Sequence, residues 1–185
     1  MKIYNSLEYT PEKKCVALGF FDGVHKGHQA VINHVINYSK KNNLVSTVLT
    51  FDKNPKSVIS NNYVLELTDI NTKQKILESM GIKNLYIINF EQIKDLSPEE
   101  FVCNILFNKL NSKCVTCGFN YYFGKNKAAD AYLLKKICKN YNIKTKIISP
   151  VLYKNLPISS TRIRKNINNI NNIKEINYML KRDFA

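Results

Sequence analysis

The feature that most constrains this chain is the segment G-F-F-D-G-V-H-K-G-H at residues 19–28, which follows a short apolar run. A strand-forming run that leads through a turn into a helix is typical of a phosphate site, because the first turn of a helix offers free N–H groups and a positive dipole end. Gly23 can form the tight turn, and Gly27 allows a close approach of the backbone. His25 and His28 flank the predicted helix start, so both imidazoles can reach one phosphate. The segment therefore predicts an anion site with two histidines.

A second segment, I-S-S-T-R-I-R at residues 158–164, carries groups suited to the same kind of ligand. Its hydroxyl side chains can cap the free N–H groups of a helix, and its arginines can clamp phosphate oxygens. Taken alone, the segment is more typical of an ordinary N-cap before a basic helix. In the same chain as the histidine segment, it indicates a second anion-binding region.

Apolar, β-forming runs alternate with amphipathic stretches along the whole chain. Strands are predicted at residues 15–20, 44–51, 85–90, 114–119 and 144–149, and helices at 27–40, 71–80, 98–110, 128–141, 161–168 and 171–182. This alternation is typical of an α/β protein in which crossover connections place helices on both faces of a parallel sheet. The sequence therefore predicts a doubly wound, Rossmann-like parallel five-stranded sheet with helices on both faces.

The chemically distinctive segments each follow one of these strands. The histidine segment follows the first strand, residues 50–55 follow the second, Asn120 follows the fourth, and residues 158–164 follow the fifth. In open α/β sheets, ligands bind beyond the carboxyl ends of the strands. We therefore expect all four segments to lie at one edge of the sheet.

Length and charge limit the class of protein. A chain of 185 residues forms one or at most two domains, and its net charge of +14 comes from 28 basic and 14 acidic residues. This excess suits polyanionic ligands. The lysines are scattered and are not interleaved with aromatic residues, so we expect no nucleic-acid partner.

The apolar runs, the N-terminus and the cysteines indicate where in the cell the protein is expected. The chain has no apolar run of about 18 residues and no signal peptide at its start, so we expect no membrane partner. Five cysteines without a disulfide framework favour a reducing compartment, and hence a cytoplasmic protein.

Cys114 and Cys117 form a C-x-x-C pair that could suggest zinc. They lie in a predicted strand, where positions three apart point to opposite faces of the sheet. No second pair of metal-ligating residues accompanies them. We therefore expect no protein-bound metal.

The two anion-binding segments closely resemble the H-x-G-H and I-S-S-T-x-x-R motifs with which the nucleotidylyltransferase superfamily binds and activates a nucleoside triphosphate. The full string at residues 19–28 is similar to that of the FMN adenylyltransferase module of prokaryotic FAD synthetases. Further segments resemble this family in order: T-F-D-K-N-P at 50–55, L-S-P-E-E-F at 96–101 and G-F-N-Y-Y-F-G at 118–124. The resemblance runs from about Cys15 to the end of the chain.

This resemblance implies transfer of AMP from ATP to FMN, giving FAD and pyrophosphate, with Mg²⁺ accompanying ATP. The FMN phosphate would attack the α-phosphorus in line, which needs positioning and charge neutralisation rather than a covalent nucleophile. The implied catalytic residues are His25, His28 and Arg164. The residues implied to bind ATP are Gly19, Phe20, Phe21, Asp22, Gly27, Ser159, Ser160 and Thr161, and those implied to bind FMN are Phe51, Asn54, Asn120 and Phe123.

Three positions depart from the family pattern on the flavin side. Lys53 and Asn54 replace the first proline and the histidine of the family's T-F-x-P-H-P loop, and Tyr122 stands where arginine is frequent. These departures leave the ATP half intact and leave the flavin contacts open.

Members of the resembled family usually continue into a riboflavin kinase module. The present sequence contains no P-T-x-N kinase motif, so we expect no riboflavin kinase activity in this chain. Its expected partner is such a module or a separate kinase. We assign residues 1–168 to the adenylyltransferase domain and residues 169–185 to a C-terminal helical tail or linker.

Two alternatives remain open at this stage. One is another nucleotidylyltransferase of the same superfamily, which would use pantetheine phosphate or nicotinamide mononucleotide. The other is a non-catalytic regulator that binds flavin or nucleotide. A fragment of a class I aminoacyl-tRNA synthetase would need a K-M-S-K-S-type loop, and the sequence has none.

Overall fold

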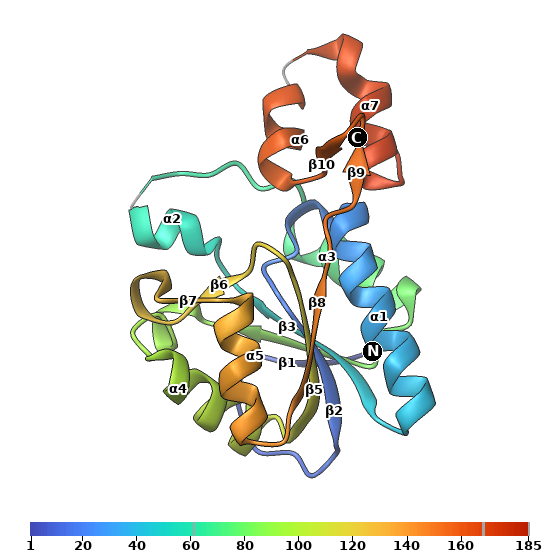
Figure 1. Cartoon of the computed structure of the whole chain (residues 1–185). Helices are drawn as coiled ribbons and strands as arrows, with labels where there is room; N and C mark the ends of the chain where they lie inside the picture. The colour runs from blue at the N-terminus through green and yellow to red at the C-terminus, as the bar shows by residue number, and fades with distance from the viewer. Residues whose placement is uncertain (61, 168, 185) are drawn as a thin grey trace.

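A parallel sheet forms the centre of the computed structural model, which describes residues 1–60, 62–167 and 169–184 (Figure 1). Its strands are β1 (Lys2–Tyr4), β2 (Lys14–Leu18), β3 (Val45–Phe51), β4 (Asn84–Ile88), β5 (Ser112–Gly118) and β8 (Lys144–Ile148). They lie in the order β1-β4-β3-β2-β5-β8, and every neighbouring pair is parallel. After β2, the chain adds β3 and β4 on one side of that strand and then adds β5 and β8 on the other side. This is the doubly wound α/β arrangement that the sequence predicts.

Helices cover both faces of this sheet. The main helices are α1 (Lys26–Asn42), α3 (Ile70–Met80), α4 (Pro98–Glu100), which continues as a π-helix over Phe101–Lys109, and α5 (Ala131–Asn140). One buried cluster joins apolar residues of α1 and α3 to one face of the sheet, and a second joins the π-helix and α5 to the opposite face. The two clusters cover the two faces of β2, and α1 packs in one of them.

The ends of several helices follow signals in the sequence. The Asp69 side chain accepts a hydrogen bond from the backbone N–H of Thr72 (2.9 Å) at the start of α3, and Gly81 ends that helix with a φ of 99°. Ser97 and Glu100 form a capping box at the start of α4. The helices predicted at 71–80 and from residue 98 are confirmed, although the helix after Glu100 has π rather than α geometry.

Several predictions about the elements were wrong. The sheet has six strands rather than five, because β1 pairs with the outer edge of β4. Tyr4 of β1 stacks on Tyr86 with ring centroids 4.5 Å apart, a tertiary contact that gives no periodic signal in a three-residue strand. The predicted helix at 128–141 starts only at Ala131, because Ala129–Asp130 forms β7 and pairs antiparallel with β6 (Tyr122–Phe123). The short helix α2 (Pro55–Ser60) was not predicted.

The C-x-x-C pair has the predicted geometry. Cys114 packs in the cluster beneath α1 and α3, whereas Cys117 packs in the cluster beneath α5. The two thiols therefore lie on opposite faces of β5, as the alternation along a strand requires.

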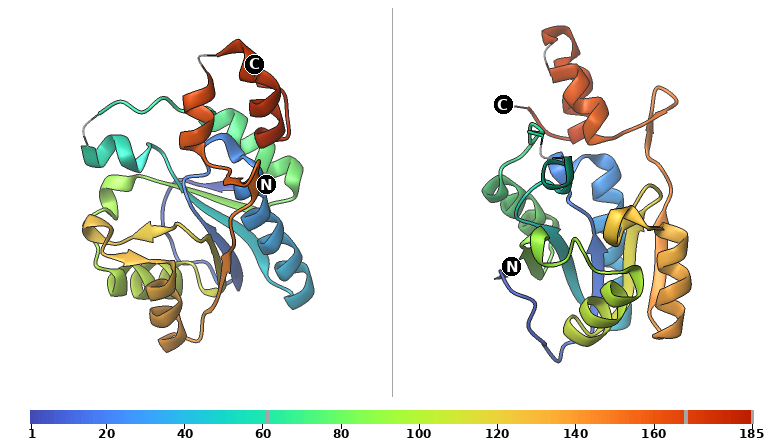
Figure 2. Two further views of the ribbon diagram at one scale, coloured as in Figure 1. Left: turned by 45° about the horizontal axis from the view of Figure 1, so that its top comes forward. Right: turned by 90° about the vertical axis from the view of Figure 1, so that its left-hand side faces the viewer.

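The last part of the chain lies beyond the carboxyl edge of the sheet (Figure 2). It contains a small hairpin of β9 (Leu152–Tyr153) and β10 (Leu156–Pro157), followed by α6 (Ser160–Ile167) and α7 (Ile173–Leu180). Residue 168, which ends the predicted helix at 161–168, lies outside the described residues. A third buried cluster joins these helices to the segment before α3, through Leu67, Ile158, Ile163, Ile176, Met179 and Leu180.

Candidate functional site

The histidine segment forms the turn between β2 and α1. His25 is the N-cap of α1, and its Nδ1 accepts a hydrogen bond from the backbone N–H of His28 (3.3 Å). The two imidazole rings stack with centroids 3.6 Å apart and planes inclined by 17°. A Cβ at Gly27 would lie 3.1 Å from His25 Cε1. A side chain at position 27 would therefore press on the His25 ring, which would have to shift by a few tenths of an ångström.

The turn before His25 has a strained backbone. Phe21, Gly23 and Val24 have φ values of 56°, 80° and 40°. Positive φ is unfavourable for a residue with a side chain, and most of all for a β-branched one such as Val24. This conformation persists because other parts of the fold hold the turn in place.

Asp22 is the main tie between the turn and the rest of the protein. It is 3% exposed, and its Oδ1 accepts hydrogen bonds from the backbone N–H groups of Leu67 (2.8 Å) and Thr68 (3.3 Å). Its Oδ2 accepts from the Arg164 guanidinium. The backbone carbonyl of Asp22 accepts from the Ser160 hydroxyl (2.9 Å). One residue therefore joins the first anion-binding segment to the second.

Two cations that were not predicted lie behind the same turn. Lys73 of α3 is 1% exposed, and its Nζ donates to the Phe20 carbonyl (3.0 Å) and lies 4.0 Å from the centre of the Phe20 ring. Arg182, after α7, donates from Nη1 to the Gly23 carbonyl (2.8 Å). Each cation belongs to a segment far from residues 19–28 in the chain, so no local pattern could have indicated its role.

The second anion-binding segment opens helix α6. The Ser159 hydroxyl accepts a hydrogen bond from the backbone N–H of Arg162 (3.2 Å). Arg162 itself points away from the turn and donates to Tyr153 O (2.8 Å) and to Glu175 Oε1 (2.7 Å). Arg164 instead points toward the turn, where its Nε donates to Leu65 O (2.6 Å). The two arginines therefore have different surroundings, with Arg162 bound to the hairpin and to α7.

The two segments face one cleft of about 360 Å³ at the carboxyl edge of the sheet. All but one of the predicted site residues line it: Gly19, Phe20, Phe21, Asp22, His25, Gly27, His28, Phe51, Asn54, Asn120, Ser159, Ser160, Thr161 and Arg164. The predicted common edge is thus confirmed, while the role of each residue stays a prediction.

Phe123 does not line this cleft. It is 7% exposed and packs in the core against Phe101 and Tyr121, with centroid distances of 5.4 Å and 5.8 Å. Phe51 is also mostly buried and contacts Phe90 edge to face, but it reaches the cleft wall. Asn54 caps the first turn of α2, since its Oδ1 accepts from the backbone N–H of Lys56 (3.0 Å).

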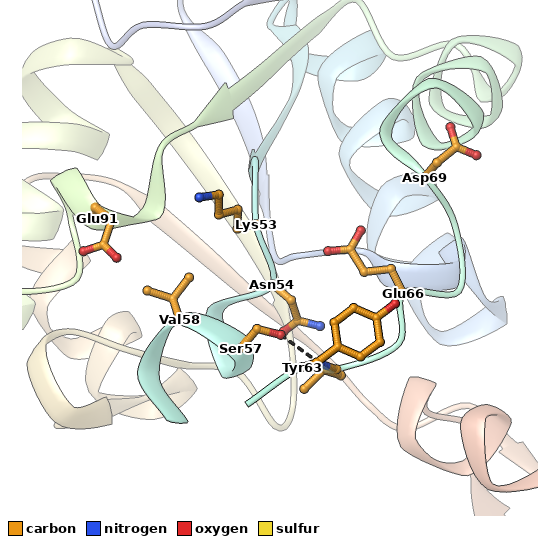
Figure 3. Close-up of a pocket in the computed structure, with 9 residues that line it drawn as sticks. Lys53, Asn54, Ser57, Val58, Tyr63, Glu66, Asp69 and Glu91 are labelled. Atoms are coloured by element: carbon orange, nitrogen blue, oxygen red, sulfur yellow. Dashed lines mark hydrogen bonds between the residues drawn. The ribbon is translucent and has the colours of Figure 1, made fainter. Parts of the chain in front are cut away.

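A second pocket, of about 600 Å³, lies beside the cleft and shares Asn54 with it (Figure 3). Lys53 and Asn54 line one side, across from Tyr63 and Glu66. Burial raises the pKa of the Glu66 carboxyl. The Ser57 hydroxyl accepts from the backbone N–H of Val64 (3.1 Å) and so connects α2 to the segment that follows it.

Both histidines are neutral near pH 7. Burial lowers the pKa of His25 to about 4. Burial, together with the neighbouring His25 and the Lys73 ammonium, holds the pKa of His28 well below its usual value. Because His25 Nδ1 accepts a hydrogen bond, the proton of the neutral ring is on Nε2. His25 can therefore donate a hydrogen bond without carrying a charge.

The side chains that could ligate a metal are dispersed in the described ranges 1–60, 62–167 and 169–184. No three or more His, Cys, Asp or Glu side chains within them are grouped to hold an ion. Both carboxylate oxygens of Asp22 already accept protein donors. Imidazole, hydroxyl and guanidinium groups, which can donate hydrogen bonds to an anion, line the cleft.

The buried histidines predict a loss of stability in mild acid. An unfolded histidine has a pKa of about 6.5, whereas folding lowers the pKa of His25 to about 4, so protonation favours the unfolded chain as pH falls through this window. The free energy of unfolding should drop by about 2 kcal/mol between pH 7.5 and pH 5 from His25 alone, and His28 adds in the same direction. Urea denaturation at the two pH values measures this drop.

The matched variant is His25→Asn, which can keep the N-cap hydrogen bond but does not titrate. Its stability should depend less on pH over the same window. An equal drop in the variant and the parent chain would contradict the assignment.

Relatives of this chain include proteins named bifunctional riboflavin kinase/FMN adenylyltransferase. The protein of that name from Buchnera aphidicola subsp. Schizaphis graminum is 38% identical over 87% of this chain and 53% of its own length. The one from Listeria monocytogenes is 36% identical over 94% of this chain and 55% of its own length. A second Listeria protein, named FAD synthetase, is 32% identical over 80% of this chain and 61% of its own length. The chain spans about half the length of the curated relatives it matches.

Solved structures are similar over the whole fold. A Streptococcus pneumoniae crystal structure titled macrolide-efflux protein has a TM-score of 0.85 and 30% identity, and covers 100% of this chain and 61% of its own. The efflux activity in that title is a statement about the pneumococcal protein. A pantothenate synthetase from Thermus thermophilus has a TM-score of 0.59 at 12% identity, covering 88% of this chain and 67% of its own, which shows a shared fold. Among the described helices of the present chain, none is long and apolar enough to span a bilayer.

The family assignment comes from a sequence model that covers most of the chain. The model described as FAD synthetase matches residues 7–162. These residues include the turn at residues 20–24 before His25 (the histidine turn), Lys73, and the three hydroxyl residues Ser159, Ser160 and Thr161. The chain therefore belongs to the FAD synthetase family.

Proposed function

We propose that this chain is an FMN adenylyltransferase, which transfers AMP from ATP to FMN and releases pyrophosphate. The observation that carries the proposal is the cleft in which two anion-binding segments face each other, with two neutral histidines at the N-terminus of α1 on one side and Arg164 on the other. Family membership and the names of the relatives support the same activity.

In the proposed reaction, an oxygen of the FMN phosphate forms a bond to the α-phosphorus of ATP, and the bond from that phosphorus to the bridging oxygen breaks. The electron pair leaves with pyrophosphate. His25, with its proton on Nε2, donates to a phosphate oxygen as negative charge grows in the transition state. His28 lies against the same ring and faces the same cleft. The chain supplies position and hydrogen bonds and needs no covalent nucleophile.

The second segment is proposed to hold the leaving group. The first turn of α6 presents free N–H groups, and Ser159, Ser160 and Thr161 add hydroxyls beside them. Arg164 is held at its Nε by Leu65 O and at Nη2 by Asp22. A guanidinium anchored at two nitrogens can still present its remaining donors to a phosphate from a fixed plane, whereas an ammonium carries its three donors on one nitrogen.

Mg²⁺ is proposed to enter with ATP as part of the substrate. Because the Asp22 carboxylate is already engaged by Leu67, Thr68 and Arg164, the ion would be bound mainly by phosphate oxygens and water. The flavin is proposed to lie toward Phe51, Asn54 and Asn120, next to the second pocket. We propose a cytoplasmic location, with a riboflavin kinase module or separate kinase as the partner.

The test of this function is a purified-protein assay with ATP, Mg²⁺ and FMN, in which FAD and pyrophosphate are separated by chromatography. FMN should be converted, while riboflavin, pantetheine phosphate and nicotinamide mononucleotide should not be adenylylated. Riboflavin should also not be phosphorylated by this chain. Binding of FMN and ATP without FAD formation would instead favour a regulator, and turnover of another phosphate acceptor would favour a different transferase.

His28→Ala should lower the turnover number by roughly 10²–10⁴-fold, because the imidazole faces charge that grows in the transition state. The affinity for ATP should change far less, since the backbone N–H groups of α1 remain. Steady-state kinetics with a separate measurement of ATP binding distinguishes the two effects. An unchanged rate, or equal losses in rate and binding, would contradict this role.

Arg164→Lys should be a poor substitute, with a turnover loss of about tenfold or more, because lysine lacks the planar fork whose separate nitrogens bind Leu65 O and Asp22. The comparison is Arg162→Lys. Its effect should appear mainly as a lower thermal midpoint, since Arg162 binds Tyr153 O and Glu175 rather than the turn. A larger catalytic loss in Arg162→Lys than in Arg164→Lys would mean that the roles are reversed.

A further inference from the structure

The segment after α6 makes a set of contacts to the histidine turn that the proposed reaction has not used. Residues 163–184 lie beyond the part of the chain matched by the family model, and the sequence predicts a tail or linker from residue 169. In the structure, α7 lies close to the start of α1 (Figure 1). Lys26 Nζ, at the first residue of α1, lies 3.1 Å from the ring centre of Tyr178 in α7.

The contacts made by this segment converge on Gly23 and Val24. A Cβ built at Gly23 would lie 2.9 Å from Leu67 and 3.4 Å from Leu180, so the glycine is enclosed between two segments. Gln29 of α1 donates from its Nε2 both to Val24 O (2.9 Å) and to Leu180 O (3.0 Å). The end of α7 and the turn therefore share one hydrogen-bond donor.

Arg182 makes the direct bond. Lys181 ends α7 with a φ of 58°, which reverses the chain and lets the next side chain point back toward the turn. Arg182 Nη1 then donates to Gly23 O at 2.8 Å. The arginine is half-buried; burial lowers its pKa, and the nearby Asp22 carboxylate opposes this effect.

The bonded carbonyl lies two residues before His25, within the stretch of positive φ angles. A backbone that is strained in this way keeps its conformation only while its surroundings determine it. A donor to Gly23 O restrains the peptide plane between Gly23 and Val24, and through it the direction from which the chain enters α1. Small displacements of groups that act on a transition state can cost about 10²-fold in rate.

We propose, on the basis of the function proposed above, that Arg182 is a positioning residue that holds the Gly23–Val24 peptide and thereby the two histidines. The C-terminal segment is thus part of the working site rather than a tail. Arg182 does not line the cleft, so it acts through the turn and not on a substrate.

The test compares Arg182→Gln, Arg182→Lys and the control Lys174→Gln. Lys174 is an exposed cation on α7 and undergoes the same change of charge. Arg182→Gln should lower the turnover number about 10- to 100-fold while the KM for ATP changes less than about threefold. Arg182→Lys, which can still donate to Gly23 O, should recover most of the rate. Lys174→Gln should match the parent chain.

A double-mutant cycle with His28→Ala separates positioning from a general loss of structure. If Arg182 acts through the histidines, Arg182→Gln should cost little further rate in the His28→Ala background. Equal losses in both backgrounds would overturn the proposal, and so would an unchanged rate in Arg182→Gln or no recovery with lysine. Circular dichroism and thermal midpoints are measured for every variant, so that the rates are compared at a temperature at which all variants are folded.

The activity of the parent chain separates a failure of the proposed function from a failure of the proposed role of Arg182. If it forms no FAD, the proposed function fails and the kinetic comparison is not made. The proposal about Arg182 then fails with it. If the parent chain forms FAD and Arg182→Gln is equally active, the function stands and only the role of Arg182 is overturned.

Discussion

The backbone turn from Phe20 to Val24 is the constraint on which the rest of the site depends. It includes three positive φ angles, at Phe21, Gly23 and Val24. Such a turn is unfavourable in isolation and is maintained by bonds from elsewhere. Thr50 and Lys73 bond to the Phe20 carbonyl, Thr68 binds the Gly23 N–H, and Asp22 is bound on both carboxylate oxygens. Because these donors come from several elements, the fold as a whole determines the shape of one short loop.

Several charged side chains lie around the histidine turn and affect the protonation of His25 and His28. Lys73, Arg164 and Arg182 all interact with the buried Asp22 carboxylate, and Glu66 is a second carboxyl close to Lys73 and Arg164. The same environment keeps both histidines neutral, since burial disfavours their charged forms and Lys73 opposes a second charge at His28. A neutral imidazole can still donate a hydrogen bond. Lys73 and Arg182 are thus set back from the cleft, whereas Arg164 and the two neutral histidines line it.

The separation of roles between the two arginines of α6 follows from helix geometry. Arg162 and Arg164 are two residues apart, so they project from different sides of the helix. One side faces the hairpin and Glu175 of α7, and the other faces the turn and Asp22.

Two of the residues that the sequence predicts to bind FMN have structural roles. Asn54, which departs from the family pattern, uses its side chain to start α2, and Phe123 packs in the core.

The sequence alone predicts the alternation of the main strands and helices along the chain and the gathering of four distinctive segments at one edge of the sheet. These follow from local periodicity and from the rule that parallel strands end together, and neither needs knowledge of side-chain contacts. Only the tertiary structure decided that β1 joins the sheet, that Ala129–Asp130 forms a strand, and that Lys73 and Arg182 hold the histidine turn. Each of these depends on a partner far away in the chain, such as Tyr86 for Tyr4 or Gly23 for Arg182. When a side chain bonds to a backbone carbonyl far away in the chain, the sequence around that side chain carries no signal of the contact. Such a contact is therefore found only in the folded structure.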